Sequence, residues 1–86
     1  MSGEESLGER LQRLREARGM TRSELAAALR ARGLWTGPDD VLRWEGDFYG
    51  PKLRTVAALA RALGVSMDVL LDGEEEAARI ARERER

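Results

Sequence analysis

The sequence contains neither cysteine nor histidine, and each absence excludes a class of functional site. Without cysteine the chain can form no disulfide and no thiolate metal site, and without histidine it lacks the side chain that most often binds metals and transfers protons near neutral pH. Glycine-rich phosphate-binding loops and Ser-x-x-Lys motifs are also missing. We therefore expect no metal, no cofactor and no catalytic residue, and we predict that the protein is not an enzyme.

A long apolar run and an excess of charge of one sign are missing as well. No stretch is apolar enough to span a membrane, and the acidic N-terminus has neither the basic nor the apolar part of a signal peptide. These features predict a cytoplasmic protein without a membrane partner. The formal net charge of −1 indicates neither a non-specific polycation for nucleic acids nor an acidic tail.

What the sequence does contain is leucine and alanine at helical spacing. A chain of this size buries only about 60% of its unfolded surface, so the leucines must supply most of its stability. Two helices are predicted to start at capping boxes, in which a hydroxyl and a carboxylate satisfy each other's free backbone amides. The first helix runs from Ser6 to about Arg18 before Gly19, and the second runs from Thr21 to about Gly33. Their expected core residues are Leu7, Leu11, Leu14, Met20, Leu25, Ala26, Ala28 and Leu29.

The segment Gly37 to Gly46 is predicted to form a short third helix. Proline suits the first turn of a helix, so Pro38 marks its start, with either Thr36 or Gly37 as the capping residue. Val41 and Trp44 lie three residues apart on the face that can be buried. Asp39, Leu42 and Arg43 are then expected to point outward.

Two further helices complete the predicted core. The fourth starts at Pro51 and buries Leu53, Val56, Leu59, Ala60 and Leu63 before Gly64, and the fifth is capped by Ser66 and partly buries Met67, Val69, Leu70 and Leu71. We accordingly divide the chain into a disordered N-terminus (1–5), a compact all-α domain (6–73) and a charged tail (74–86). The tail is either helical or disordered, because it carries too few apolar residues to fold alone.

The order of these motifs resembles the Cro/repressor-type helix-turn-helix family of bacterial and phage transcription regulators, also called the XRE family. The resemblance covers about residues 7–71. It rests on Leu11-x-x-Leu14-Arg15-x-x-x-Gly19, Thr21-x-x-Glu24-Leu25-Ala26, Arg43-Trp44-Glu45, Pro51 and Leu59-Ala60-x-x-Leu63-Gly64-Val65-Ser66. It implies a five-helix, lambda-repressor-like domain that regulates transcription by binding double-stranded DNA, usually as a homodimer on a palindromic operator.

The resemblance also implies roles for individual residues. The helix over residues 38–46 would enter the major groove, the start of the second helix would lie on phosphates, and Arg15 would pair with Glu45. Arg22 is otherwise a solvated arginine, Arg43 can pair with Asp39 instead of guanine, and the aspartates can simply favour the helix dipole. The candidate DNA-binding residues are Thr21, Arg22, Pro38, Asp39, Asp40, Leu42, Arg43, Lys52 and Arg54.

The chain departs from the family pattern in ways that keep a second function open. The connection before the third helix is longer than usual, the start of that helix is acidic, and an aromatic pair replaces the usual basic residues in the loop after it. We expect one of Phe48 and Tyr49 to close the core and the other to face outward, and we expect Trp35 to cover the junction of the second and third helices. The alternative function is protein docking, as in an antitoxin or a polymerase- or sigma-factor-binding module, through the surface from Asp39 to Tyr49 with Trp35.

Overall fold

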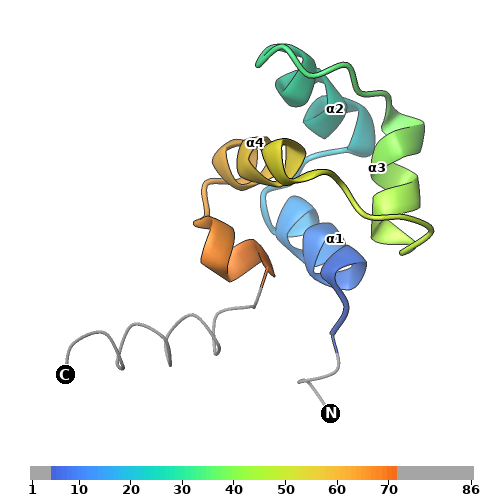
Figure 1. Cartoon of the computed structure of the whole chain (residues 1–86), viewed down its shortest axis with the longest axis vertical. Coiled ribbons are helices and arrows are strands. Elements are labelled where there is room, and N and C mark those ends of the chain that lie inside the picture. The colour runs from blue at the N-terminus through green and yellow to red at the C-terminus, as the bar shows by residue number, and fades with distance from the viewer. Residues whose placement is uncertain (1–4, 72–86) are drawn as a thin grey trace, which may run out of the picture.

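The computed structural model describes residues 5–71, and within that range every regular element is a helix. The four longer helices are α1 (Leu7–Ala17), α2 (Arg22–Arg30), α3 (Pro38–Glu45) and α4 (Leu53–Leu63) (Figure 1). A fifth helical segment covers residues 67–71. The predicted five-helix, all-α fold is therefore confirmed. No helix within residues 5–71 is long and apolar enough to cross a membrane.

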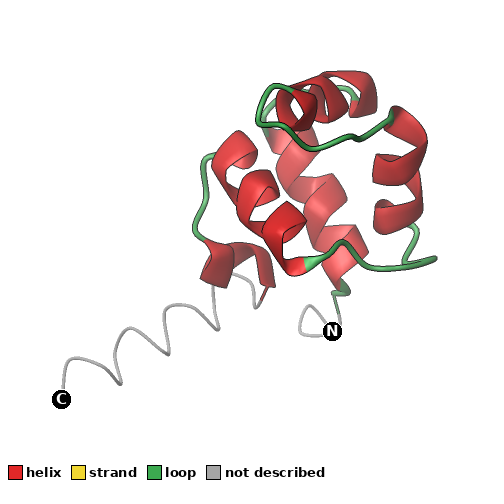
Figure 2. Cartoon of the chain, turned by 45° about the horizontal axis from the view of Figure 1, so that its top comes forward, coloured by secondary structure: helices red, strands yellow, loops and turns green. Residues whose placement is uncertain are grey.

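The core lies where the four longer helices meet. Helix α2 packs on both α3 and α4, and α1 packs on α3, while the connections run over the outside of the helical body (Figure 2). Each helix contributes its apolar stripe to one cluster, as the leucine spacing predicted. The largest fully buried side chains are Leu11, Leu25, Leu29, Val41, Leu59, Leu63 and Leu70.

Both predicted capping boxes are present. In the first, the Glu9 amide donates to Ser6 Oγ at 3.1 Å and the Ser6 amide donates to Glu9 Oε1 at 2.8 Å. Thr21 and Glu24 repeat this arrangement at 3.0 and 2.8 Å. Because these bonds satisfy amides that have no partner inside a helix, they fix where α1 and α2 begin.

The start of α4 differs from the prediction. The helix begins at Leu53 with Lys52 as its N-cap, two residues later than expected, and Leu53 is 72% exposed although it was predicted to be buried. As the first helical residue, Leu53 lies on a turn that faces solvent, whereas Val56, one turn further on, is buried. The predicted helical spacing of the apolar residues in α4 was correct, but these residues are buried only from the second turn of the helix onward.

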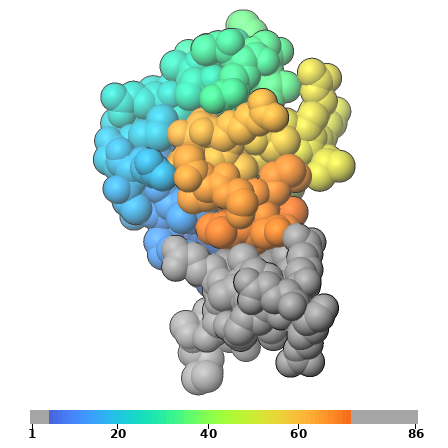
Figure 3. Space-filling model, turned by 90° about the vertical axis from the view of Figure 1, so that its left-hand side faces the viewer, coloured from blue at the N-terminus to red at the C-terminus, as the bar shows by residue number. Residues whose placement is uncertain are grey.

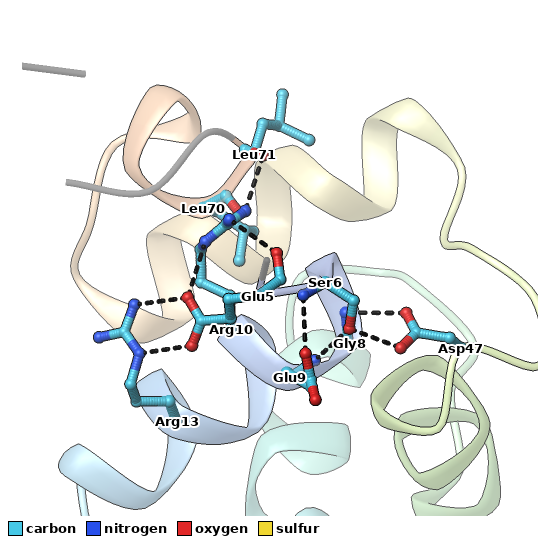
Figure 4. A network of polar contacts seen from close by, with 9 residues as sticks. All are labelled: Glu5, Ser6, Gly8, Glu9, Arg10, Arg13, Asp47, Leu70 and Leu71. Carbon is cyan, nitrogen blue, oxygen red and sulfur yellow. Dashed lines mark hydrogen bonds and ion pairs between the residues drawn. The ribbon is translucent and has the colours of Figure 1, made fainter. Parts of the chain in front are cut away.

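The ends of the described chain are fixed by polar contacts with α1 (Figure 4). Glu5, the last residue of the N-terminal segment that was predicted to be disordered, forms ion pairs with Arg10 and Arg13, at 3.3 and 2.8 Å. The buried guanidinium of Arg10 donates to the carbonyls of Leu70 and Leu71 at 3.0 and 2.7 Å, which joins the fifth helical segment to α1. Three parts of the predicted domain division lie outside the described residues, namely residues 1–4, the domain end at Gly73 and the tail (74–86).

Candidate nucleic-acid interface

Helix α3 is held at its start by its own carboxylate. Pro38 occupies the first turn, and Gly37 is the N-cap. Asp40 Oδ2 accepts a hydrogen bond from the Gly37 amide at 3.0 Å, while the Thr36 hydroxyl donates to the Leu34 carbonyl instead. The choice between Thr36 and Gly37 is thereby settled in favour of Gly37, with Asp40 serving the free amide.

The two faces of α3 are distributed as predicted. Val41 is fully buried and Trp44 is 8% exposed, so they anchor the helix on the core. On the other side Asp39 and Arg43 are exposed, and Leu42 is 47% exposed. A short helix whose back is buried in this way presents its outward side chains in a fixed geometry, which is the requirement for reading a surface.

A buried carboxylate joins the end of α3 to the two helices before it. Glu45 Oε2 accepts from Arg15 Nε at 2.5 Å, and Glu45 Oε1 accepts from Arg15 Nη2 at 3.2 Å. Arg15 also donates to the Met20 carbonyl at 2.7 Å. The hydrogen bond with Glu45 raises the pKa of the Arg15 guanidinium above its ordinary value and outweighs the opposite effect of burial. The structure thus brings together the two residues that the family resemblance paired.

Arg22 occupies a position that neither sequence-based alternative described. Its Nε donates to Glu45 Oε1 at 2.9 Å, and its side chain is 38% exposed. It is therefore neither a solvated arginine nor a side chain wholly available to a phosphate. The start of α2 and the end of α3 are joined through one carboxylate, which fixes the angle between the two helices.

The neighbouring aspartates of α3 have different surroundings. Asp40 accepts from the Gly37 amide and from the Tyr49 hydroxyl, the latter at 3.0 Å. The Gly37 amide, then the Tyr49 hydroxyl and the charge of Arg43 together lower the pKa of Asp40 below its ordinary value. Within residues 5–71, Asp39 has no hydrogen bond or ion pair, so the alternative in which it pairs with Arg43 is not observed.

This difference predicts unequal effects of removing the two carboxylates. Asp40→Ala should lower the free energy of unfolding by about 0.5–1 kcal/mol at pH 7, because a charged group at a helix start is lost, whereas Asp39→Ala should cost less. Urea denaturation followed by circular dichroism measures both variants. Because folding depresses the pKa of Asp40, its contribution is complete above the ordinary value of 3.8 and disappears as pH falls through the lower folded value. Equal costs for the two variants at pH 7 would contradict the capping role.

The loop after α3 is anchored on the start of α1. Asp47 has a φ of 59°, and its carboxylate accepts from Ser6 Oγ at 2.6 Å and from the Gly8 amide at 3.0 Å (Figure 4). Both aromatic residues that follow are exposed, Phe48 by 78% and Tyr49 by 46%. The prediction that one of them closes the core is wrong, because the Phe48 ring lies over Gly46, within 2.8 Å of where a Cβ would stand, instead of reaching the core.

The connection between α2 and α3 exposes its tryptophan. Leu34 packs against the core and Thr36 is 3% exposed, while Trp35 between them is 95% exposed. In an extended segment successive side chains point to opposite sides, so burial of Leu34 and Thr36 turns Trp35 outward. Arg30 holds this arrangement by donating to the Thr36 carbonyl at 2.6 Å. The prediction that Trp35 covers the helix junction is therefore wrong.

The structure brings part of the predicted site together around a hollow of about 390 Å³. Lys52 and Arg54 from the start of α4 line it beside the exposed Trp35 and Tyr49. Trp44 also lines it, and the buried Trp44 Nε1 has no hydrogen-bond partner. Thr21 lies apart, at the cap of α2, and Pro38 is exposed at the first turn of α3. The hollow has no local sequence signal, because its walls come from three separate segments.

The helices and their buried ion pair define a class of protein, the Cro/repressor-type helix-turn-helix domain. The family model of the helix-turn-helix domain matches residues 6–72, and the chain belongs to this family. Among solved structures, the P22 c2 repressor in complex with a synthetic operator is similar, with a TM-score of 0.68 and 25% sequence identity. This similarity covers 79% of the present chain and 96% of the repressor chain. A search of the curated proteins finds no match.

Proposed function

We propose that the protein is a sequence-specific, DNA-binding transcriptional regulator of the repressor type. The observation that carries the proposal is the structural similarity to the P22 c2 repressor. This similarity covers nearly all of the repressor chain, and the repressor structure was solved in complex with operator DNA. In this proposal α3 is the recognition helix and enters the major groove, and two copies of a cytoplasmic homodimer read two half-sites. The rigid backing of α3 by Val41, Trp44 and Glu45 supports this role.

The outward residues of α3 carry the sequence reading in this proposal. Arg43 donates two hydrogen bonds to guanine, Leu42 contacts a thymine methyl group, and Asp39 accepts from a cytosine amino group. Pro38 and Asp40 set the position of the helix start beside the bases. The phosphate contacts come from the starts of α2 and α4, through Thr21, Arg22, Lys52 and Arg54.

The charge of the folded body supports binding to a polyanion. Residues 5–71 contain 11 lysines and arginines and 9 aspartates and glutamates, although the whole chain carries a formal net charge of −1. The excess of negative charge therefore lies outside the helical body, and the body itself is a net cation. The near-zero charge of the chain does not weigh against DNA binding.

The test exploits the unpaired Asp39. Asp39→Asn should raise the affinity for random duplex DNA at low salt, because it removes a negative charge that faces the phosphates. It should also relax selectivity at one operator position, since asparagine can hydrogen-bond to adenine. Fluorescence anisotropy on random duplexes, and on duplexes selected from random DNA by the parent protein, measures both effects at two salt concentrations.

Asp68→Asn is the matched control. Asp68 is exposed, has no hydrogen bond or ion pair within residues 5–71 and lies on the fifth helical segment, so its replacement removes the same charge away from α3. An equal rise in affinity for both variants would show that α3 does not face the DNA. If the parent binds no duplex even at low salt, the regulator proposal is abandoned.

One observation favours protein docking as the second candidate function. Five large apolar side chains of α3 and of the segments next to it in the chain are exposed, and exposed apolar surface can mark a protein-interaction site. They are Trp35, Leu42, Phe48, Tyr49 and Leu53. If this surface docks another protein, Asp39→Asn should weaken the complex with that partner, and neither the parent nor the variant should bind DNA.

A further inference from the structure

The two arginines that bind the buried Glu45 carboxylate differ in the donors they leave unused. Arg15 is engaged at all three of its side-chain nitrogens, because Nε and Nη2 donate to Glu45 and Nη1 donates to the Met20 carbonyl. Arg22 donates to Glu45 through Nε alone, at 2.9 Å, and its side chain makes no other hydrogen bond within residues 5–71. Both terminal nitrogens of Arg22 are therefore available to a ligand.

A guanidinium group can bind two anions at once. It is a rigid plane with five N–H donors, so a bond from Nε to one carboxylate leaves the terminal nitrogens able to donate two parallel bonds to another oxyanion. The Glu45 side chain is 2% exposed, whereas the Arg22 side chain is 38% exposed. Glu45 thus holds the Arg22 guanidinium from the interior, while solvent reaches Arg22 from the other side.

The charges around Glu45 leave Arg22 incompletely neutralised. Arg15 and Arg22 contribute two cations, and Glu45 contributes one anion. Glu16 contacts this group only at Arg15 Nη2, at 3.8 Å, and its side chain is 59% exposed, so solvent and salt screen its charge. Arg22 forms an ion pair with no carboxylate other than Glu45 within residues 5–71. A second anion at the exposed side of Arg22 would supply the missing negative charge.

The location of Arg22 determines which anion can reach it. Arg22 is the first residue of α2, and its bond to Glu45 places its guanidinium at the end of α3. In the proposed function α3 lies in the major groove, and the edges of that groove are formed by phosphates. A phosphate also matches the paired donors of a guanidinium group. The DNA backbone is therefore the expected source of the second anion.

We propose that Arg22 binds a DNA phosphate through its two terminal nitrogens while Glu45 holds its Nε, and that Glu45 is thereby a positioning residue for DNA binding. This inference rests on the proposed function and deepens it. A side chain that is already held at one end loses less freedom when it binds, so the phosphate contact is preorganised. Because Glu45 is the last residue of α3, the same carboxylate fixes this contact relative to the recognition helix.

Arg22→Lys distinguishes this arrangement from a simple surface charge, with fluorescence anisotropy on random and selected duplexes as the measurement. Arg22→Gln should weaken binding to all duplexes by about tenfold or more. It should also make the dependence of log K on log salt shallower by about 0.9, which corresponds to one phosphate contact. Arg22→Lys should still bind more weakly than the parent, because a single ammonium group cannot pair with Glu45 and also present two donors to a phosphate. Equal affinities of Arg22→Lys and the parent would overturn the proposal.

Arg61→Gln is the matched control for the loss of charge. Arg61 is exposed, has no hydrogen bond or ion pair within residues 5–71 and lies in the last turn of α4. Figure 3 looks onto the side of the body where α4 ends, and in Figure 1 α3 lies at the opposite edge. The control therefore removes the same charge far from α3 and should leave the salt dependence unchanged. Equal changes in Arg61→Gln and Arg22→Gln would contradict a phosphate contact at Arg22.

Glu45→Gln tests the positioning role, at a temperature at which circular dichroism shows all variants to be folded. Loss of a negative charge by itself would strengthen DNA binding. We expect weaker binding instead, because Arg22 is no longer held by a carboxylate, and we expect no further weakening when the substitution is added to Arg22→Gln. Stronger binding, or equal weakening with and without Arg22, would overturn the positioning role. Arg22→Lys decides the question if Glu45→Gln does not fold.

The outcomes separate this inference from the proposed function. If the parent protein binds no duplex at low salt, both are wrong. If the parent binds duplexes and Arg22→Lys binds them equally well, the DNA-binding function stands and only the role assigned to Arg22 and Glu45 is wrong.

Discussion

Glu45→Ala should remove most of the free energy of unfolding of the protein and lower its melting temperature strongly. The Glu45 side chain is 2% exposed and is bound by Arg15, whose side chain is 8% exposed, and by Arg22. Removing one partner of a buried pair leaves an uncompensated charge in the interior and costs about 3–5 kcal/mol. Small domains are stable by only about 5–15 kcal/mol, and a chain of this size lies near the lower limit.

Thermal unfolding followed by circular dichroism measures the effect, with Arg22→Ala as the control. Arg22 is 38% exposed, so its removal should cost no more than about 1 kcal/mol, because it leaves Glu45 paired with Arg15. Glu45→Gln should fall between the two variants, because the amide oxygen can still accept from Arg15. A melting temperature for Glu45→Ala within a few degrees of the parent would show that the carboxylate is not buried on Arg15.

The parts of the fold that were predictable are those that local sequence determines. A capping box spans four residues, so Ser6 and Thr21 could be recognised as helix starts without tertiary information. Gly19 and Gly64 have φ values of 67° and 71°, a conformation that favours glycine and ends helices. The buried face of α3 followed from the spacing of Val41 and Trp44.

The errors concern residues whose burial depends on the direction of a loop. Trp35 and Phe48 are large and apolar, so burial was the reasonable expectation from composition. Their backbones turn them outward because neighbouring groups are fixed by partners elsewhere, Thr36 by Arg30 and Asp47 by the start of α1. Asp47 and Gly8 are 39 residues apart, and no local pattern connects them.

The two aspartates at the start of α3 differ in their contacts, which the sequence did not indicate. From the sequence, Asp39 and Asp40 were equivalent candidates for base contacts or for stabilising the helix dipole. The structure assigns Asp40 to the Gly37 amide and the Tyr49 hydroxyl and leaves Asp39 unpaired. Only Asp39 is therefore available for a new contact without the loss of an internal one, while both carboxylates keep their negative charge.

The second large effect is expected from Gly8→Ala. This substitution should lower the free energy of unfolding, whereas replacing glycine by alanine in a helix usually raises it. Glycine in a helix generally costs about 0.5–1 kcal/mol relative to alanine, so this substitution in α1 would ordinarily stabilise the protein. A Cβ on Gly8 would stand 2.4 Å from the Trp44 carbonyl oxygen and 2.5 Å from the Glu45 carbonyl oxygen. It would also stand 2.7 Å from Asp47 Oδ1. These contacts are too short, and two of the three atoms belong to the backbone of α3.

The methyl group must therefore push α1 away from the end of α3, which also strains the bonds that Asp47 makes with Ser6 and Gly8. We expect a loss of about 1–3 kcal/mol, the usual cost of overpacking a tightly packed contact. Urea denaturation measures it against Gly50→Ala, because a Cβ on Gly50 has no neighbour within 4 Å and Gly50 does not have a positive φ. Gly50→Ala should stay within a few tenths of a kcal/mol of the parent, as substitutions away from such contacts do. If Gly8→Ala were as stable as the parent or more stable, α1 could not approach α3 as closely as described, and the position of the loop at Asp47 would have to be revised.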